Sequence, residues 1–229
     1  MSSSSSATRT EIEQYRNDVL RNKIRCDLPH CPGCSTPPDL FKRHQARPRK
    51  FYILCDTLVR TVLCLVLRWR CPGCSKTFTQ QPPFAFPRKR YIRESILNFS
   101  ARYVEDQAAT YRTAVSDEEG MSIYHTLTSE GDTTRYKILA HSTPYRWITC
   151  LGGLKQVLRG AQDLILQKDP ASTVCRDLAS IQVSARKYVK AARESMLKRC
   201  RQVLHLEVRF RSTFLASIFP FYATRCAWG

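Results

Sequence analysis

The chain repeats one short cysteine motif whose spacing suits metal binding. The two copies are Cys31-Pro-Gly-Cys34 and Cys71-Pro-Gly-Cys74. Each Cys-x-x-Cys turn brings two thiolates to one ion, and two such turns complete the four-sulfur tetrahedral shell of a structural zinc site. Proline fixes φ on entry to the turn, and glycine accepts backbone angles that let the following N–H groups point at the sulfurs. The pair therefore predicts one Zn²⁺ held by Cys31, Cys34, Cys71 and Cys74.

Other cysteines and a histidine complicate the choice of ligands. A lone Cys-x-x-Cys could be a redox pair, but the second copy favours zinc. Cys26 and His30 precede the first motif and could supplement a ligand, although flanking residues of this kind are more often bystanders. The remaining cysteines lack a partner at ligand spacing and are expected to be buried, inert thiols: Cys55, Cys64, Cys150, Cys175, Cys200 and Cys226.

The segments around the second motif favour extended strands. Residues 51–70 are rich in Val, Leu, Ile and aromatic residues, and residues 76–80 suggest a further short strand. A small antiparallel sheet of this kind is marginal without a metal, so residues 26–80 are expected to form a zinc ribbon. Charged side chains interrupt the apolar run and argue against a membrane-spanning helix: Asp56, Arg60 and Arg68.

The charge of the chain is strongly positive and unevenly distributed. Lys and Arg number 37 against 19 Asp and Glu, which gives a formal net charge of +18. Such an excess favours a polyanionic partner, although a solvated basic face is the alternative reading. The candidate phosphate-binding residues fall in two tracts interleaved with aromatic side chains: Lys42, Arg43, Arg47, Arg49 and Lys50, then Arg88, Lys89, Arg90 and Arg93.

The residue pattern of the second half of the chain predicts helices. Residues 81–90 contain three prolines and are expected to be a linker. Helical spacing over residues 91–113 predicts the first helix of a second domain, and residues 121–127 suggest a short helix. A well-bounded helix follows the Ser and Thr after His141, with Pro144 at the favoured first position and glycines at the end.

That bounded helix has two faces. Trp147, Ile148 and Leu151 fall on one side of the helical wheel, which would be the core side. The other side would suit a recognition helix of a helix-turn-helix, because its side chains can reach base edges and phosphates in the major groove. An ordinary amphipathic helix is the alternative. The outward residues are Tyr145, Arg146 and Thr149.

The C-terminal stretch from residue 154 is also mostly helical. A second helix-turn-helix could run from 172–181 into a helix capped by Ser184, although a packing or dimerisation bundle fits equally well. The apolar end, 214–222, is interpreted as a docking tail. The second candidate recognition helix would present Arg186, Lys187, Lys190 and Arg193.

The order of these features resembles the N-terminal DNA-binding region of bacterial insertion-sequence transposases and related zinc-ribbon proteins of mobile elements. The resemblance covers residues 26–153 and rests on the paired cysteine motifs, Trp69-Arg70-Cys71, Lys76-Thr-Phe78 and Thr143-Pro-Tyr-Arg-Trp147. It implies DNA binding. Transposases of this type continue into an RNase H-like domain with acidic residues that hold two metal ions. The stretch after Gly153 is too short for that fold, so the resemblance implies binding without cutting.

The sequence thus predicts an α+β protein: a small N-terminal zinc-ribbon sheet followed by a mostly α-helical domain with a helix-turn-helix. The expected segments are a tail and lead-in helix (1–25), the zinc ribbon (26–80), a Pro-rich basic linker (81–90), the helix-turn-helix domain (91–153) and a C-terminal helical region for oligomerisation or docking (154–229).

The predicted function is non-catalytic, zinc-dependent binding of double-stranded DNA for a mobile element. No Gly-rich phosphate loop, His-Glu-x-x-His helix or credible Ser-His-Asp set occurs in the sequence. The N-terminal serine run lacks the features of a signal peptide, which favours a cytoplasmic, nucleoid-associated protein. Two alternatives remain: an adaptor that recruits a recombinase or nuclease through its C-terminal region, and an RNA-binding module.

Overall fold

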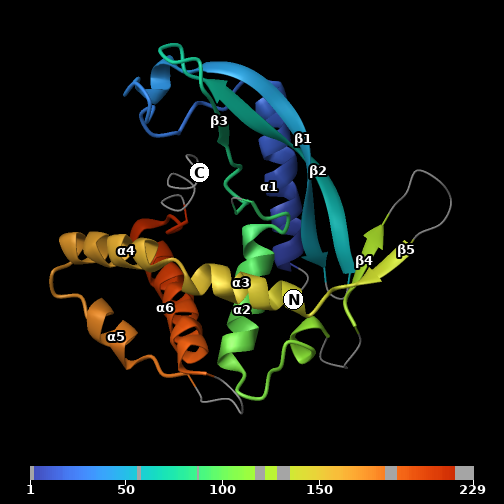
Figure 1. Ribbon diagram of the computed structural model, residues 1–229, viewed down its shortest axis with the longest axis vertical. Coiled ribbons are helices and arrows are strands. Elements are labelled where there is room, and N and C mark those ends of the chain that lie inside the picture. The colour runs from blue at the N-terminus through green and yellow to red at the C-terminus, as the bar shows by residue number, and fades with distance from the viewer. Residues whose placement is uncertain are drawn as a thin grey trace. The chain divides into compact units, whose positions relative to one another are not determined.

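The computed structural model describes residues 3–55, 58–86, 88–116, 122–127, 135–183 and 190–219 (Figure 1). The fold is α+β, as predicted, with an antiparallel sheet and six helices among the described residues. The chain divides into two compact units. Unit 1 is built mainly from Met1–Glu94 and includes His125–Lys137, whereas unit 2 is built from Ser95–Tyr124 and Ile138–Tyr222.

The main element of unit 1 is a long antiparallel hairpin, which is visible as a curved ribbon in Figure 1. Its strands are β1 (Lys42–Cys55) and β2 (Leu58–Arg70), with the register shifted between Arg43 and Gln45. The short strand β3 (Thr77–Gln80) pairs with the end of β2. β2 and β3 are the strands that the apolar, β-branched composition predicts.

The sheet continues with two strands that the local sequence pattern did not indicate. β4 (Tyr124–Leu127) lies beside β2, and β5 (Arg135–Ile138) lies beside β4. The prediction of a short helix over 121–127 is therefore wrong at residues 124–127. Pairing with a neighbouring strand decides the conformation of so short a segment, and its own residue pattern does not.

The core of unit 1 lies between the hairpin and helix α1 (Ser3–Leu20). Ile12, Tyr15 and Val19 of α1 are buried in it. Phe84 joins the same core, with its ring edge-on to that of Tyr15 at a centroid distance of 5.7 Å. The described residues of the segment interpreted as a linker, 81–86 and 88–90, are therefore not a free linker, because Phe84 and Ala85 are part of the core of unit 1 and Phe86 is buried.

Unit 2 contains the remaining helices. They are α2 (Arg93–Glu105), α3 (Ser142–Gly152), α4 (Lys155–Lys168), α5 (Val174–Ser180) and α6 (Ala191–Phe214). α2 ends at Glu105 and is therefore shorter than the predicted helix over 91–113. α3 ends at Gly152, as predicted, but it begins earlier than predicted: Pro144 is its third residue, and the N-cap is His141, which forms no side-chain cap hydrogen bond. α3 packs against α6, and the Arg199 Nε–H of α6 donates to the carbonyl oxygen of Gly152 at 2.8 Å.

Two glycines of unit 2 should respond in opposite ways to a methyl group. A Cβ at Gly152 would lie 2.5 Å from the Met196 carbonyl oxygen, so α3 and α6 would have to separate. A Cβ at Gly160, inside α4, meets nothing within 4 Å. We expect Gly152→Ala to lower the free energy of unfolding by about 1–3 kcal/mol. We expect Gly160→Ala to raise the free energy of unfolding by about 0.5–1 kcal/mol. Urea titration of the two variants and the parent measures these changes. A change of the same sign in both variants would contradict the prediction.

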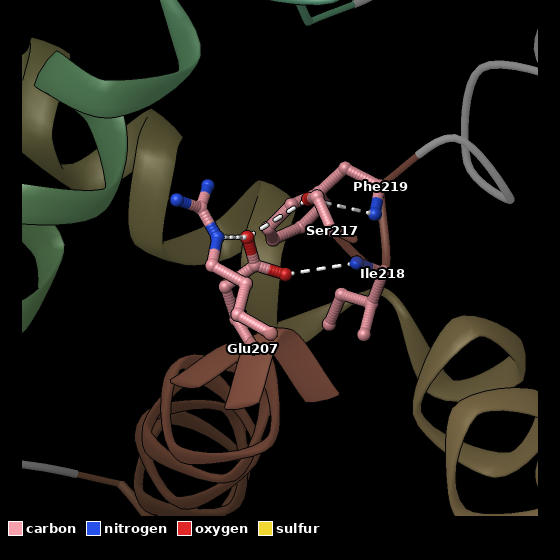
Figure 2. A network of polar contacts seen from close by, with 5 residues as sticks. Glu207, Ser217, Ile218 and Phe219 are labelled. Carbon is pink, nitrogen blue, oxygen red and sulfur yellow. Dashed lines mark hydrogen bonds and ion pairs between the residues drawn. The ribbon is translucent and has the colours of Figure 1, made fainter. Parts of the chain in front are cut away.

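A buried carboxylate on α6 binds the segment that follows the helix (Figure 2). Glu207 is 4% exposed, accepts hydrogen bonds from Ser217 Oγ at 2.8 Å and the Ile218 N–H at 2.9 Å, and forms an ion pair with Arg211. Ile218 and Phe219 are buried as a result. These two residues of the predicted docking tail are therefore packed inside unit 2 and do not form an exposed docking surface. Residues 220–222 lie outside the described part of the chain.

Candidate metal centre and basic surface

The two cysteine motifs meet in space at one end of the hairpin. The four sulfur atoms all lie within 4.8 Å of one another. Cys31 Sγ is 3.4 Å from Cys74 Sγ, and Cys34 Sγ is 3.3 Å from Cys71 Sγ. A tetrahedral ion with bonds of about 2.3 Å needs sulfur–sulfur edges of about 3.8 Å, which lies inside this range. The four cysteines can therefore hold one metal ion.

The two motifs have the same local fold. In each, the first cysteine's N–H donates to the carbonyl oxygen five residues later, and its own carbonyl oxygen accepts from the serine that follows the motif, at 2.8–3.0 Å. These serines, Ser35 and Ser75, adopt the left-handed φ values of 56° and 61°. The left-handed conformation that closes each turn is thus at serine, whereas glycine was the expected residue.

At one of the two motifs, glycine is required for another reason: neighbouring atoms lie too close to leave room for a side chain. A Cβ at Gly73 would lie 2.7 Å from Thr36 Oγ1 and 3.0 Å from Cys34 Sγ, so a ligand would have to move. A Cβ at Gly33 would meet only the end of the flexible Lys76 side chain, at 3.2 Å.

We expect Gly73→Ala to weaken metal binding by about 10- to 100-fold, the range typical of residues that position ligands. The matched variant Gly33→Ala should stay close to the parent, because the Lys76 side chain can swing away. Competition for metal with a chromophoric chelator measures both. Equal affinities of the two variants would contradict the role of Gly73.

The surroundings of two of the sulfurs, those of Cys34 and Cys71, favour the thiolate form that metals bind. Thr36 lowers the pKa of Cys34 through its hydroxyl, 3.0 Å from the sulfur, and through its backbone N–H. Burial raises the pKa of Cys71, but hydrogen bonds from Thr36 and from the motif backbone outweigh it and bring the pKa to about 6. The Lys76 N–H lowers the pKa of Cys74, whereas burial and the neighbouring thiols raise it to about 11. A bound ion must displace that last proton, so affinity should fall as the pH falls.

The other candidate ligands stay outside this cluster. The four motif cysteines are the one group of three or more close Cys, His, Asp or Glu side chains found in the described part of the chain. Cys26 is half-buried and His30 is exposed. Cys64 and Cys200 are buried, as expected, but Cys175 is exposed. The side chains of Cys55 and Cys226 lie outside the described part.

The two strands of the hairpin beside the four-cysteine cluster carry charged side chains of positive sign only. Its two strands contain no Asp or Glu. We define the basic hairpin as its eight Lys and Arg residues, three of which, on β2, the sequence analysis did not select. Within the described residues none of the eight forms an ion pair with a carboxylate. The members are Lys42, Arg43, Arg47, Arg49, Lys50, Arg60, Arg68 and Arg70.

Cross-strand register concentrates this charge near the metal centre. Lys42 lies directly opposite Arg70, and both side chains are exposed. Like charges in opposite positions of an antiparallel pair are destabilising. The Arg70 guanidinium donates to Ser75 Oγ at 3.1 Å. This hydrogen bond holds the guanidinium in place, but the neutral hydroxyl does not balance its positive charge. This arrangement favours an anionic partner.

The structure brings together the two basic tracts that are separate in sequence. The N–H of Tyr52 on β1 donates to the Arg90 carbonyl oxygen at 2.8 Å, and Arg90 donates to the Tyr52 hydroxyl at 3.3 Å. Arg49 donates to the Lys89 carbonyl oxygen at 3.1 Å. Burial and the nearby Arg90 charge lower the pKa of Arg49. Arg88, in the left-handed conformation at φ 61°, is exposed.

The other residues predicted to contact nucleic acid differ in how exposed they are, and some lie outside the described residues. Arg93 is half-buried in the first turn of α2, and Lys190 is exposed at the start of α6. Arg186 and Lys187 lie outside the described residues, as does Ser184. The predicted faces of α3 are confirmed for its core side, since Trp147, Ile148 and Leu151 are buried.

The outward side of α3 is only partly free. Tyr145 and Arg146 are exposed, whereas Thr149 is half-buried and accepts a hydrogen bond from Arg193 of α6 at 3.1 Å. A direct base contact by Thr149 would have to compete with that bond. The role of α3 as a recognition helix stays a prediction.

Comparison of the chain with protein-family models, with curated proteins and with solved structures gave no match in any of the three. None of the described helices is both long and apolar enough to cross a membrane.

Proposed function

We propose that this protein is a zinc-dependent, non-catalytic nucleic-acid-binding protein that binds double-stranded DNA through the basic hairpin and the adjoining tract Arg88, Lys89 and Arg90. The observation that carries the proposal is the set of eight hairpin cations, which have no carboxylate partner among the residues that the structure describes, with Lys42 opposite Arg70. Phosphates would supply the missing countercharge, and release of counterions would supply much of the affinity.

Zinc is the ion that this donor set favours. Four cysteine sulfurs in a tetrahedral arrangement suit Zn²⁺ or an iron–sulfur centre, and a closed four-sulfur shell is the usual form of a structural zinc site. The ion would join residues on either side of the hairpin, since Cys34 precedes β1 and Cys71 directly follows β2. Zinc would therefore hold the basic hairpin in shape without taking part in a reaction.

A role in site recognition for a mobile element is the finer part of the proposal. It is supported by the resemblance of residues 26–153 to the DNA-binding region of insertion-sequence transposases and by the exposed Tyr145 and Arg146 on α3. In this reading the hairpin supplies phosphate contacts that do not depend on sequence, and α3 supplies the preference for a site.

The test is the salt dependence of binding to double-stranded DNA, single-stranded DNA and RNA of the same length. We expect the double variant Lys42→Gln/Arg70→Gln to weaken binding to every duplex sequence. The slope of log affinity against log salt should fall by about 2 units, at about 0.9 for each lost phosphate contact. A matched variant of two exposed cations on α4, Lys155→Gln/Arg159→Gln, should keep the parent slope.

The outcomes separate the alternatives. An unchanged slope in the hairpin variant would make the hairpin a solvated basic face. Tighter binding to RNA than to duplex DNA would favour the RNA-binding module. If the protein bound none of the three nucleic acids, the adaptor hypothesis would remain, in which the protein recruits an effector.

A further inference from the structure

Unit 2 contains a cluster of tyrosines around one arginine. The rings of Tyr103 and Tyr111 are stacked, with centroids 4.6 Å apart and planes at 5°, and Tyr111 meets Tyr145 edge-on at 5.6 Å. The Arg193 guanidinium carbon lies 4.4 Å from the Tyr145 ring centroid and 5.5 Å from that of Tyr111. Segments far apart in sequence thus supply the rings and the cation: the end of α2, the loop after it, α3 and α6.

The cation in this cluster is fixed by neutral groups. Arg193 donates hydrogen bonds to the Tyr111 hydroxyl and to Thr149 Oγ1, and its guanidinium also contacts Met196 Sδ. Thr149 in turn donates to the Tyr145 carbonyl oxygen at 2.8 Å, which ties the arrangement to α3. No carboxylate pairs with Arg193 within the described residues. In this part of the chain, the positive charge over the Tyr145 ring is therefore not paired with a negative one.

The Tyr145 ring keeps an open surface. The residue is 47% exposed although Arg193 and Tyr111 both contact the ring. Tyr103, which stacks on Tyr111, is by contrast 4% exposed. Exposed arginines follow both rings in sequence, Arg112 after Tyr111 and Arg146 after Tyr145. Proteins bind unpaired nucleotides with exposed aromatic rings on which the base stacks and with cations that the phosphate meets. Tyr145 can supply the ring, and the exposed arginines that neighbour Tyr111 and Tyr145 in sequence can supply the charge.

We infer that Tyr145 is a stacking platform for an unpaired nucleobase, with Arg193 and Thr149 as positioning residues that hold the ring. The site takes a single-stranded end or an unpaired base next to a duplex. This inference rests on the proposed function, in which the basic hairpin of unit 1 binds duplex phosphates. It adds a preference for DNA that carries unpaired bases, which the hairpin alone cannot provide because phosphates are common to all DNA.

The experiment compares two duplexes that carry the same charge. Both have the same paired region and a short single-stranded overhang, and the overhang bears either normal bases or abasic residues. The parent protein should bind the overhang with bases about 10-fold more tightly, within the range of stacking one or two bases on an aromatic side chain. In Tyr145→Leu the two affinities should become nearly equal, while Tyr145→Phe should keep the preference. The fluorescence of 2-aminopurine at the first unpaired position should be quenched by the parent and by Tyr145→Phe only.

The outcomes distinguish this inference from the proposed function. Equal affinity of the parent for both overhangs would overturn the stacking site and leave duplex binding intact. A preference that persists in Tyr145→Leu would also overturn it. The hairpin variant Lys42→Gln/Arg70→Gln should weaken both complexes by the same factor, and binding of neither DNA by the parent would overturn both proposals. The comparison of overhangs in the parent needs no variant, so misfolding of Tyr145→Leu would not obscure the result.

Discussion

Cys71→Ser should abolish metal binding and unfold the end of unit 1 that the metal holds. The Cys71 side chain is fully buried and its sulfur is 3.3 Å from that of Cys34, so a hydroxyl in its place would leave an incomplete shell. Structural zinc contributes apparent binding free energies of about 10–16 kcal/mol in zinc-finger peptides, most of which appears as folding energy. We therefore expect this variant to have the largest effect of any single substitution.

Elemental analysis of the purified protein, combined with circular dichroism before and after chelation, measures this effect. The matched control is Cys175→Ser, since Cys175 is exposed and stands outside the four-cysteine cluster. It should keep the metal content of the parent. Retention of full metal content by Cys71→Ser would remove Cys71 from the ligand set. Iron instead of zinc in the parent would identify the alternative occupant of a four-sulfur site.

Trp147→Ala should cause the largest loss of stability in unit 2. Trp147 is 3% exposed, and its ring meets that of Phe99 edge-on at 5.5 Å. Removing a fully buried aromatic side chain costs about 3–5 kcal/mol, because transfer energy is lost and a cavity remains. The free energy of unfolding from urea titration should fall by that amount, and Trp147→Phe should lose less.

Its neighbour on the opposite face of α3 provides the control. Arg146 is exposed, so Arg146→Ala should change the free energy of unfolding by no more than about 0.5 kcal/mol. If Arg146 reads a base, the same variant should lower affinity for a preferred DNA site by about 1–3 kcal/mol and affect random duplex much less. A stability loss in Arg146→Ala as large as that in Trp147→Ala would contradict the two-faced description of α3.

The four-cysteine cluster and the α+β class could be predicted from the sequence because each depends on local geometry. A Cys-x-x-Cys turn places its two sulfurs together whatever the surrounding fold, and two copies leave little choice of partner. The end and the core side of α3 could be predicted for a similar reason, since helical periodicity and flanking Gly are local signals. The tightness of packing around Gly73 could not, because it depends on the Cys34 sulfur from the other motif.

The surfaces proposed to bind nucleic acid were decided by tertiary structure. Residues 88–90 join the hairpin because Phe84 enters the core and the backbone around Tyr91 pairs with Tyr52, neither of which the prolines of a presumed linker suggest. Strand pairing sets Arg70 against Lys42, and packing of α6 sets Arg193 against Tyr145. Pairs such as these are separated by tens of residues along the chain, so no local pattern encodes them. They form only when burial of apolar side chains elsewhere sets the register of the paired strands and determines which face each helix turns to its neighbour.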